Sequence, residues 1–336
     1  MNSLKLLSAA SSLALALVAL PISAMADTPS PADSADNLAA AVVAAADGVG
    51  GPQQDVSKEG GSYVASTDAG KVEVGNTSGS QVSLARDPAS ALVVGIPEVS
   101  GGATAQTTDS GTLVYDNDDS SVAVTVQALQ QGVRLSTVLK DASAPTEYVY
   151  PVAVPPGGRI ETDPASDAVL VTDASNALVG GFAPAWAKDA NGDTVPTHYE
   201  VRADAVVQVV DLSAGGYTFP VVADPFLGAD LIDHATWVHY SDGWTLQVFP
   251  TGWARFNAGS HLVGSYAWDE LYTKYQNHGL TKNLNGMRDQ LICHEEFVAV
   301  REPGKASWNL DEWRPDVGHL QTVNSNCNPG GLRWFD

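Results

Sequence analysis

Residues 122–139 read VAVTVQALQQGVRLSTVL, and valine fills every second position from Val122 to Val126. The alternation resumes at Val133 and Leu135, after a short glutamine-glycine interruption. Because successive side chains of a strand point to opposite faces of a sheet, a period of two predicts β-strands with one buried and one solvated face.

Similar alternating runs extend over residues 61–228, separated by turn clusters such as Asp116–Asp119 and Pro155–Gly158. Short strands between frequent turns are typical of antiparallel β-sandwiches. A segment of about 160 residues can also bury a core without disulfide bonds. We therefore expect a mainly β chain with an antiparallel, β-sandwich-like domain over residues 61–228.

The N-terminus has the pattern of a signal peptide. A short, singly charged start, Met1–Lys5, precedes the apolar stretch Leu6–Leu20, and Ala24–Ala26 offers small residues on either side of a methionine. The alternative is a membrane anchor, but about 15 apolar residues are fewer than the roughly 20 that span a bilayer. We expect cleavage after Ala26, so that residues 1–26 are removed and the mature chain is secreted, without a transmembrane segment.

The segment that follows, residues 27–60, is rich in Ala, Asp, Ser, Pro and Gly. Leu38–Ala46 has the composition of a short helix, but its flanks are too polar and small to bury much surface. We therefore expect a disordered or loosely attached leader.

Charge and aromatic composition both change near residue 228. Residues 27–230 carry 8 Lys and Arg against 27 Asp and Glu, whereas residues 231–336 carry 8 against 12. Six of the seven histidines and seven of the eight tryptophans lie after residue 230. An acidic surface repels phosphate backbones, so nucleic acid is not an expected partner of the β-rich part. The shift predicts a separate domain over residues 229–336.

This last segment predicts a small α+β domain. Two aromatic runs, Thr236–Tyr240 and Trp244–Phe249, flank Ser241–Gly243, which is the signal of a hairpin with a three-residue turn. Apolar residues at helical spacing then predict one helix after Ser265 and a second over about Leu284–Phe297.

Both cysteines of the mature chain lie in this segment, at Cys293 and Cys327. An even number of cysteines in a secreted protein favours a disulfide bond, which would close a loop of 34 positions. Closing such a loop stabilises a domain by roughly 3–4 kcal/mol on the chain-entropy model. A metal site and a catalytic thiol are the alternatives; a structural zinc normally needs four ligands, and only His294 and His319 could help.

The most concentrated polar group surrounds Cys293. On a helix, Asp289 and Glu296 share the face of Cys293, and His294 lies on the adjacent face. His319 lies inside the loop that the disulfide would close. Two imidazoles with a carboxylate to orient them would suit general acid–base catalysis near neutral pH, so we take His294, His319, Asp289 and Glu296 as candidate catalytic residues. The alternative is a buried structural histidine beside solvated acids.

The tail offers candidate binding residues, Trp308, Asn309, Trp313 and Arg314. Aromatic faces with hydrogen-bonding groups between them are what a sugar- or peptide-binding groove uses. The same residues could instead form the core of a small domain that has few aliphatic side chains.

The other motifs of the chain do not indicate a metal site, a cofactor site or a common catalytic site. Asp189–Asp193, with Glu200 further on, superficially fits a calcium loop, but Thr194 replaces the required glycine and Pro196 interrupts it. Asn-Gly between strands predicts a hairpin turn there. The chain contains no G-x-S-x-G, H-E-x-x-H, P-loop or dinucleotide motif. We expect no cofactor and no metal.

Three sequence segments of the last domain, which occur in a fixed order, resemble those of a known family. They are Met287–His294, ending in Cys-His; Lys305–Pro315, with Trp-Asn-Leu and Arg-Pro; and Cys327–Pro329, with Cys-Asn-Pro. Over about residues 232–333 the chain resembles the DUF2599 family, of unknown function, found in secreted actinobacterial proteins. The resemblance implies that the family pattern includes Cys293, His294, Trp308, Arg314 and Cys327. It implies no reaction. The β-rich segment is similar, less specifically, to regions that carry variable C-terminal domains on actinobacterial surface proteins.

These observations favour a secreted, envelope- or host-facing protein whose β-domain presents a C-terminal binding module, with cell-wall glycan or another protein as its partner. One alternative is a secreted hydrolase or toxin-like effector that uses His294 and His319 as acid–base residues. Another is a structural surface protein.

Overall fold

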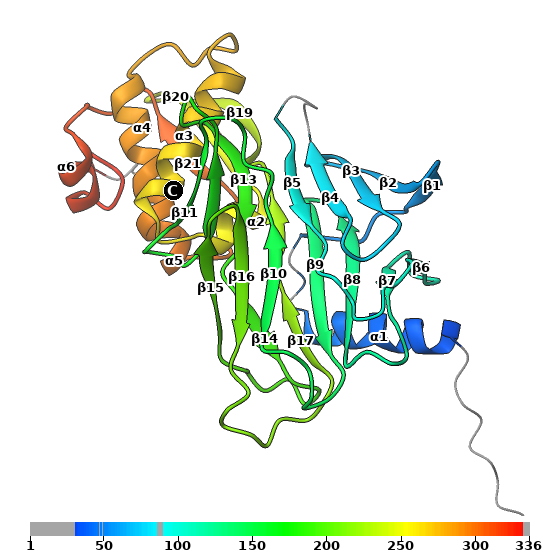
Figure 1. Cartoon of the computed structure of the whole chain (residues 1–336). Helices are drawn as coiled ribbons and strands as arrows, with labels where there is room; N and C mark the ends of the chain where they lie inside the picture. Colours follow the sequence, from blue (N-terminus) through cyan, green and yellow to red (C-terminus); the bar gives the residue numbers. More distant parts are fainter. Residues whose placement is uncertain (1–30, 47, 49, 86–89, 332–336) are drawn as a thin grey trace, which may run out of the picture.

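The structure is a computed structural model that describes residues 31–46, 48, 50–85 and 90–331. The expected signal peptide, residues 1–26, lies outside the described residues. The fold is mainly β with several antiparallel sheets, followed by a small helix-rich C-terminal domain, as the sequence predicted (Figure 1). No helix in the described ranges is long and apolar enough to cross a membrane.

The first sheet has five antiparallel strands that follow the chain order. These are β1 (Ser57–Glu59), β2 (Ser62–Thr67), β3 (Gly70–Gly75), β4 (Gln81–Ala85) and β5 (Leu92–Gly95).

The second sheet is the largest and has ten strands, in the order β11-β12-β13-β18-β9-β8-β7-β6, with β17 also paired to β9 and β14 to β17. Their bounds are β6 (Gln106–Thr107), β7 (Leu113–Tyr115), β8 (Val122–Leu129), β9 (Gly132–Leu139), β11 (Arg159–Thr162), β12 (Val169–Thr172), β13 (Leu178–Phe182), β14 (Trp186–Lys188), β17 (Val221–Asp224) and β18 (Phe226–Gly228). A third sheet of the β-domain orders β10 (Glu147–Pro151), β16 (Ala205–Val210) and β15 (Thr197–Arg202).

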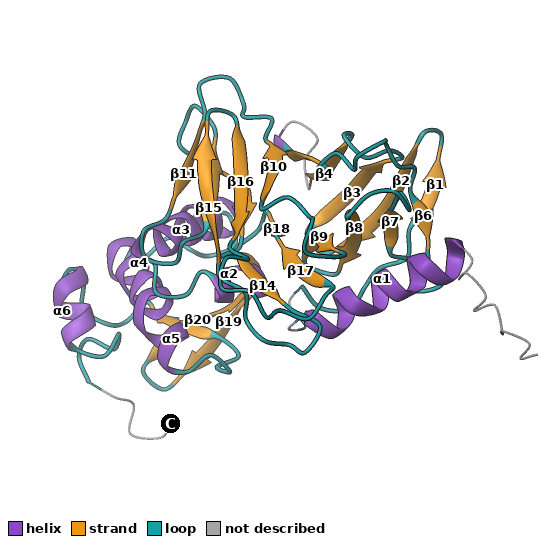
Figure 2. Ribbon diagram, turned by 60° about the horizontal axis from the view of Figure 1, so that its bottom comes forward, coloured by secondary structure: helices purple, strands orange, loops and turns teal. Residues whose placement is uncertain are grey.

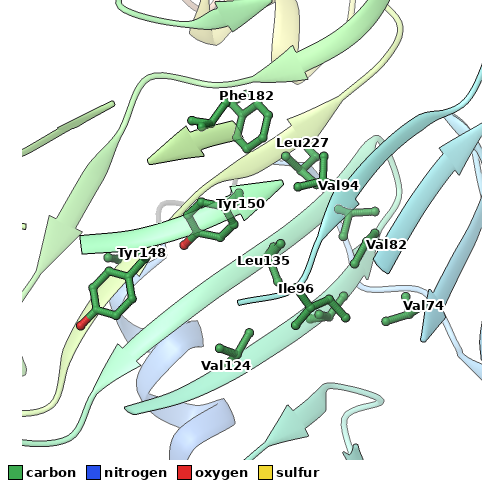
Figure 3. Close-up of a cluster of buried hydrophobic side chains, with 14 of the residues drawn as sticks. Val74, Val82, Val94, Ile96, Val124, Leu135, Tyr148, Tyr150, Phe182 and Leu227 are labelled. Carbon is green, nitrogen blue, oxygen red and sulfur yellow. The ribbon is translucent and has the colours of Figure 1, made fainter. Parts of the chain in front are cut away.

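The sheets pack face to face around one apolar core. Figure 3 shows Val82 and Val94 of the first sheet in one apolar cluster with Val124 and Leu135 of the second, and Tyr150 of the third sheet belongs to the same cluster. Two packed sheets with alternating inward residues are the sandwich arrangement that the valine pattern predicted.

The paired strands β8 and β9 differ from the expectation of one solvated face, because every residue of both strands is buried. Val124 and Leu135 point into the core between the sheets, whereas Ala123 and Val138 point the other way. That second face is covered by a helix, so neither side of the central strands reaches solvent (Figure 2).

The covering helix is α1 (Pro31–Ala45), in the segment that the sequence predicted to be a disordered or loosely attached leader. That prediction was wrong for these residues: Leu38 and Val42 are buried against Ala123 and Val138. The small alanines that suggested weak burial are strong helix formers, and their size lets the helix lie close to the sheet. Lys188 Nζ also donates to the carbonyl of Ala45 at 2.9 Å.

The acidic loop after β14 is a turn closed by one carboxylate. Asp189 accepts the N–H groups of Asn191, Asp193 and Thr218 at 2.9–3.0 Å. These backbone hydrogen bonds, led by the one from Thr218, hold the pKa of the Asp189 carboxyl below its usual value. Asp189 therefore serves the hairpin turn that the sequence predicted.

The C-terminal domain, as described to residue 331, has a three-stranded antiparallel sheet ordered β19 (Ile232–Tyr240), β20 (Gly243–Pro250) and β21 (Trp308–Asp311). Its helices are α2 (Gly252–Phe256), α3 (His261–Tyr275), α4 (Leu284–Cys293), the π-helical turn η2 (His294–Val298), α5 (Ala299–Arg301) and α6 (His319–Asn324).

Two details of this domain differ from the sequence prediction. Tyr240 pairs with Gly243, so the hairpin turn contains two residues rather than three. The first long helix begins at His261 rather than after Ser265, because the hydroxyl of Ser260 accepts the N–H of Val263 and caps it.

The C-terminal domain packs directly on the β-domain. Phe226 and Leu129 share a buried cluster with Trp253. The fit is close, since a Cβ placed on Gly228 would lie 2.3 Å from Trp253 Cγ. Polar contacts add to it: Tyr266 donates to Glu161 at 2.8 Å. The contact includes both apolar and polar groups, so the two parts are held in one orientation.

Candidate functional site

The predicted disulfide bond joins Cys293 to Cys327, with Cα atoms 5.5 Å apart. Both cysteines are fully buried, next to Val298 and Val323. The bond fixes the end of α4 to the loop after α6, so the C-terminal segment is held against the helices.

His294 follows the disulfide and begins the π-helical turn. The residue is 4% exposed, and neither ring nitrogen makes a hydrogen bond of normal geometry within the described part of the chain. Burial, helped by the charge of Lys305, lowers the pKa of His294 to about 4. The imidazole is therefore neutral near pH 7, which suits a structural position better than proton exchange.

This environment predicts a pH-dependent stability. Between pH 6.5 and about 4, the unfolded chain binds a proton at His294 that the folded chain does not, so the free energy of unfolding falls as the pH is lowered through that window. The total effect is about 3 kcal/mol. We expect urea denaturation of wild type and His294→Gln to show a stability difference that changes with pH by this amount. The exposed His278→Gln is the control, and an unchanging difference for His294→Gln would contradict the buried, neutral state.

A second histidine cluster lies at the surface. Glu296 Oε2 is 3.0 Å from His319 Nε2 and 3.3 Å from His261 Nδ1. The two imidazole rings meet edge to face with centroids 4.8 Å apart. We call His261, Glu296 and His319 the His–Glu–His cluster. It brings together two predicted residues and one, His261, that the sequence analysis missed.

Asp289 lies beside this cluster. Burial raises the pKa of its carboxyl, and the charges of His319 and Arg288 oppose that rise. Asp289 and Glu296, which the helical spacing placed on one face, thus both interact with His319. No hydrogen bond or ring contact among the described residues joins this group to His294.

Glu295 is a buried acid that sequence reasoning passed over. It is fully buried, and neither carboxyl oxygen has a hydrogen-bond partner among the described residues. Burial raises the pKa of Glu295 well above its usual value, against the opposing charge of Arg255. Helical periodicity gave no signal for it, because a π-helical turn changes which face a side chain occupies.

The predicted binding residues of the tail are mostly interior. Trp308 is fully buried in the core of the C-terminal domain. Arg314 is 4% exposed and its Nε is 2.6 Å from Asp311 Oδ2. Trp313 is half-buried with the Arg314 guanidinium 4.5 Å from its ring centroid. For Trp308 and Arg314 the core interpretation fits the geometry.

Asn309 belongs instead to an open face of the three-stranded sheet. Side chains alternate across the strands, so that Leu246 and Val248 point inward while a row of polar and aromatic groups points outward. The exposed and half-buried members of this row, which we call the sheet face, are His234, Thr236, Val238, Tyr240, Gln247, Phe249 and Asn309. Thr245 and Asp311 share the same orientation but are buried.

The sheet face is ordered by contacts between neighbouring strands. The His234 and Phe249 rings stack with centroids 4.2 Å apart and planes inclined by 9°. Gln247 donates to the hydroxyl of Tyr240 at 3.3 Å. His234 and Thr236 are exposed, and the other members are half-buried. The result is a flat surface that combines aromatic rings with amide and hydroxyl groups.

A cleft of about 1080 Å³ lies elsewhere, in the β-domain. It is lined by Glu98, Asp119, Glu147 and Tyr148 among others, and by none of the predicted site residues. Its carboxylates give it an acidic rim.

The described geometry agrees with a family match. The model of the family described as "Protein of unknown function (DUF2599)" matches residues 232–330. Residues 232–330 are similar to the DUF2599 family, and we call this part of the chain the DUF2599 domain. Three of its sequence elements have structural roles here: the cysteines form the disulfide, Trp308 fills the core, and Arg314 forms a buried ion pair.

Relatives of the DUF2599 domain occur in mycobacteria. Uncharacterized proteins of Mycobacterium bovis and Mycobacterium tuberculosis are 36% identical over 100 residues, which is 30% of this chain and 66% of each relative. An uncharacterized protein of Mycobacterium leprae is 28% identical over 108 residues, 32% of this chain and 85% of its own length. The chain thus spans less than two thirds of the first relatives it matches.

One solved structure is similar at a low level. It is a glycoside hydrolase family 81 protein from Clostridium thermocellum, with a TM-score of 0.25 and 9% identity, covering 57% of this chain and 27% of that one. At this TM-score the similarity carries no argument about the fold or activity of the present chain.

Proposed function

We propose that this chain is a secreted, envelope- or host-facing protein whose β-domain holds the DUF2599 domain as a binding module for cell-wall glycan. The observation that carries the proposal is the sheet face, a partly exposed strand surface that combines aromatic rings with amide and hydroxyl groups. The buried disulfide bond supports an oxidising, extracytoplasmic location.

Glycan recognition fits the chemistry of the sheet face. A sugar ring presents an apolar face that packs on an aromatic ring, and the stacked His234 and Phe249 offer such a surface. Its hydroxyl groups need donors and acceptors, which Gln247, Thr236 and Asn309 supply at the spacing of neighbouring strands. A flat strand surface suits an extended polysaccharide better than a small enclosed ligand.

The attachment of the two domains supports a presenting role for the β-domain. Trp253 fills the space above Gly228, and Tyr266 is hydrogen-bonded to Glu161, so the DUF2599 domain does not need a separate anchor to keep its orientation. A fixed orientation lowers the entropic cost of binding to a surface that is itself immobile.

The test is retention of the mature chain, residues 27–336, on purified actinobacterial cell walls and on glycan arrays. We expect wild type to be retained, and the double variant His234→Ala/Phe249→Ala to bind at least 10-fold more weakly. Trp244→Ala is the matched control, because Trp244 is an exposed aromatic residue of the same hairpin that points away from the sheet face.

Wild type that flows through every matrix would contradict the proposal. Retention that disappears when the walls are first treated with protease would instead identify a protein partner.

The His–Glu–His cluster favours a second candidate, an acid–base effector. His319 and Glu296 are hydrogen-bonded at a partly exposed surface, and Asp289 lies next to them. In such an enzyme His319, rather than the neutral and buried His294, would exchange protons. Its test is growth of a bacterial host that exports residues 27–336: toxicity lost in His319→Ala but kept in His198→Ala would support it, and harmless expression of folded protein would count against it.

A further inference from the structure

The His–Glu–His cluster has the composition and spacing of a metal-binding site. We propose that His261, Glu296 and His319 bind one divalent transition-metal ion of the zinc class. The sequence alone predicted no metal, because His261 lies 35 positions from Glu296 and gives no recognisable spacing motif. The proposal is independent of glycan binding, since the cluster shares no residue with the sheet face.

The distances suit a tetrahedral ion. Zinc binds imidazole nitrogen and carboxylate oxygen at about 2.0–2.2 Å, which places neighbouring ligand atoms of a tetrahedral site about 3.3–3.5 Å apart. Glu296 Oε2 lies 3.0 and 3.3 Å from the nearest nitrogens of the two histidines. All three ligand atoms lie within 4.8 Å of one another. Small side-chain rotations would therefore bring them around a single ion.

The ligand types select the class of metal. Two imidazoles and one carboxylate suit zinc, copper, nickel or cobalt, whereas calcium and magnesium prefer oxygen ligands alone. Three protein ligands leave a fourth position open, and the His261 side chain is 53% exposed, so water can reach that position.

The charge around the cluster also favours a cation. Asp289 lies close enough to interact electrostatically with both His261 and His319, and Asp316 interacts with Asp289 in turn. Together with Glu296, these are three carboxylates, against which the guanidinium of Arg288 supplies one positive charge. A divalent ion would reduce the repulsion among these carboxylates.

Each ligand comes from a different element. His261 is the first residue of α3, Glu296 lies in the π-helical turn, and His319 is the first residue of α6. An ion would therefore tie α6 to the helices by a second connection, in addition to the disulfide at Cys327. π-helical turns are frequent at functional sites, which agrees with the position of Glu296.

The test uses the mature chain without a histidine tag, stripped with EDTA and titrated with ZnCl2 by isothermal calorimetry and with CoCl2 by visible absorption. We expect one equivalent to bind, the intense d–d bands of tetrahedral cobalt, and a higher melting temperature with zinc. His261→Ala and Glu296→Gln should weaken binding at least 100-fold, and millimolar CaCl2 should not compete.

His198→Ala is the matched control, because His198 is also an exposed histidine beside a glutamate but belongs to no group of three potential metal ligands among the described residues. Wild-type affinity in His261→Ala and Glu296→Gln would overturn the proposal, as would octahedral cobalt spectra or zinc binding that His198→Ala weakens equally. Both ligand variants change partly exposed side chains, and circular dichroism checks that they fold.

Discussion

Replacing Asp311 with alanine is expected to lower the free energy of unfolding by about 3–5 kcal/mol. Asp311 is buried, accepts hydrogen bonds from Arg314 Nε at 2.6 Å and from the hydroxyl of Thr245, and is the carboxylate that neutralises Arg314. Without it, the guanidinium would remain buried and lose its counter-ion. Urea denaturation followed by tryptophan fluorescence at pH 7 measures the effect.

The effect of Asp311→Ala would extend beyond β21, because Arg314 also contacts the C-terminal loop. Its Nη1 donates to the carbonyls of Pro329 and Gly331 at 3.1 and 2.6 Å, so it connects the end of β21 to the C-terminal loop. Asp316→Ala is the control, because Asp316 is exposed and lies near Arg314 in sequence. A loss below about 1 kcal/mol in Asp311→Ala would mean that the ion pair contributes little to the fold.

Removal of the disulfide bond is the second large effect. The double variant Cys293→Ala/Cys327→Ala is expected to lose roughly 3–4 kcal/mol, because the unfolded chain regains the freedom of a loop that spans 34 positions. Both sulfurs are fully buried, so the smaller side chains also leave unfilled space next to Val298. Denaturation of the variant and of chemically reduced wild type measures the loss.

The two measurements separate two contributions to the loss, and the double variant should lose at least as much stability as reduced wild type. Reduced wild type keeps both sulfur atoms but lacks the bond, so it isolates the loop contribution from the packing contribution. If the double variant and reduced wild type unfolded at the same urea concentration as oxidised wild type, the disulfide bond would not stabilise the C-terminal segment.

Much of the β-domain could be predicted from the sequence, because its signal is local. The valine alternation at Val122–Val126 depends only on neighbouring residues, and β8 forms there. The complete burial of β8 could not be predicted, since it depends on α1, whose Val42 comes from residues 80 positions earlier. An alanine-rich composition indicates a helix, but it does not indicate whether that helix packs on a sheet.

The candidate site, too, could be predicted only where the signal was local in sequence. The Cys293–Cys327 pairing follows from the number of cysteines, and helical spacing grouped Asp289 with Glu296, both of which interact with His319. His261 carries no local signal, because only tertiary packing brings the start of α3 beside the π-helical turn. The interleaved aromatic residues of the tail suggested a groove, but a small domain with few aliphatic residues uses Trp308 for its core.

We propose that recognition takes place on the sheet face, while the family elements hold the fold. The most direct measurement is a titration of the ¹⁵N-labelled mature chain with soluble cell-wall glycan fragments, followed by amide chemical shifts. We expect the largest changes to cluster on β19, β20 and β21, around Phe249 and Asn309. Changes concentrated at the His–Glu–His cluster or around the cleft of the β-domain, with the sheet face unaffected, would contradict it.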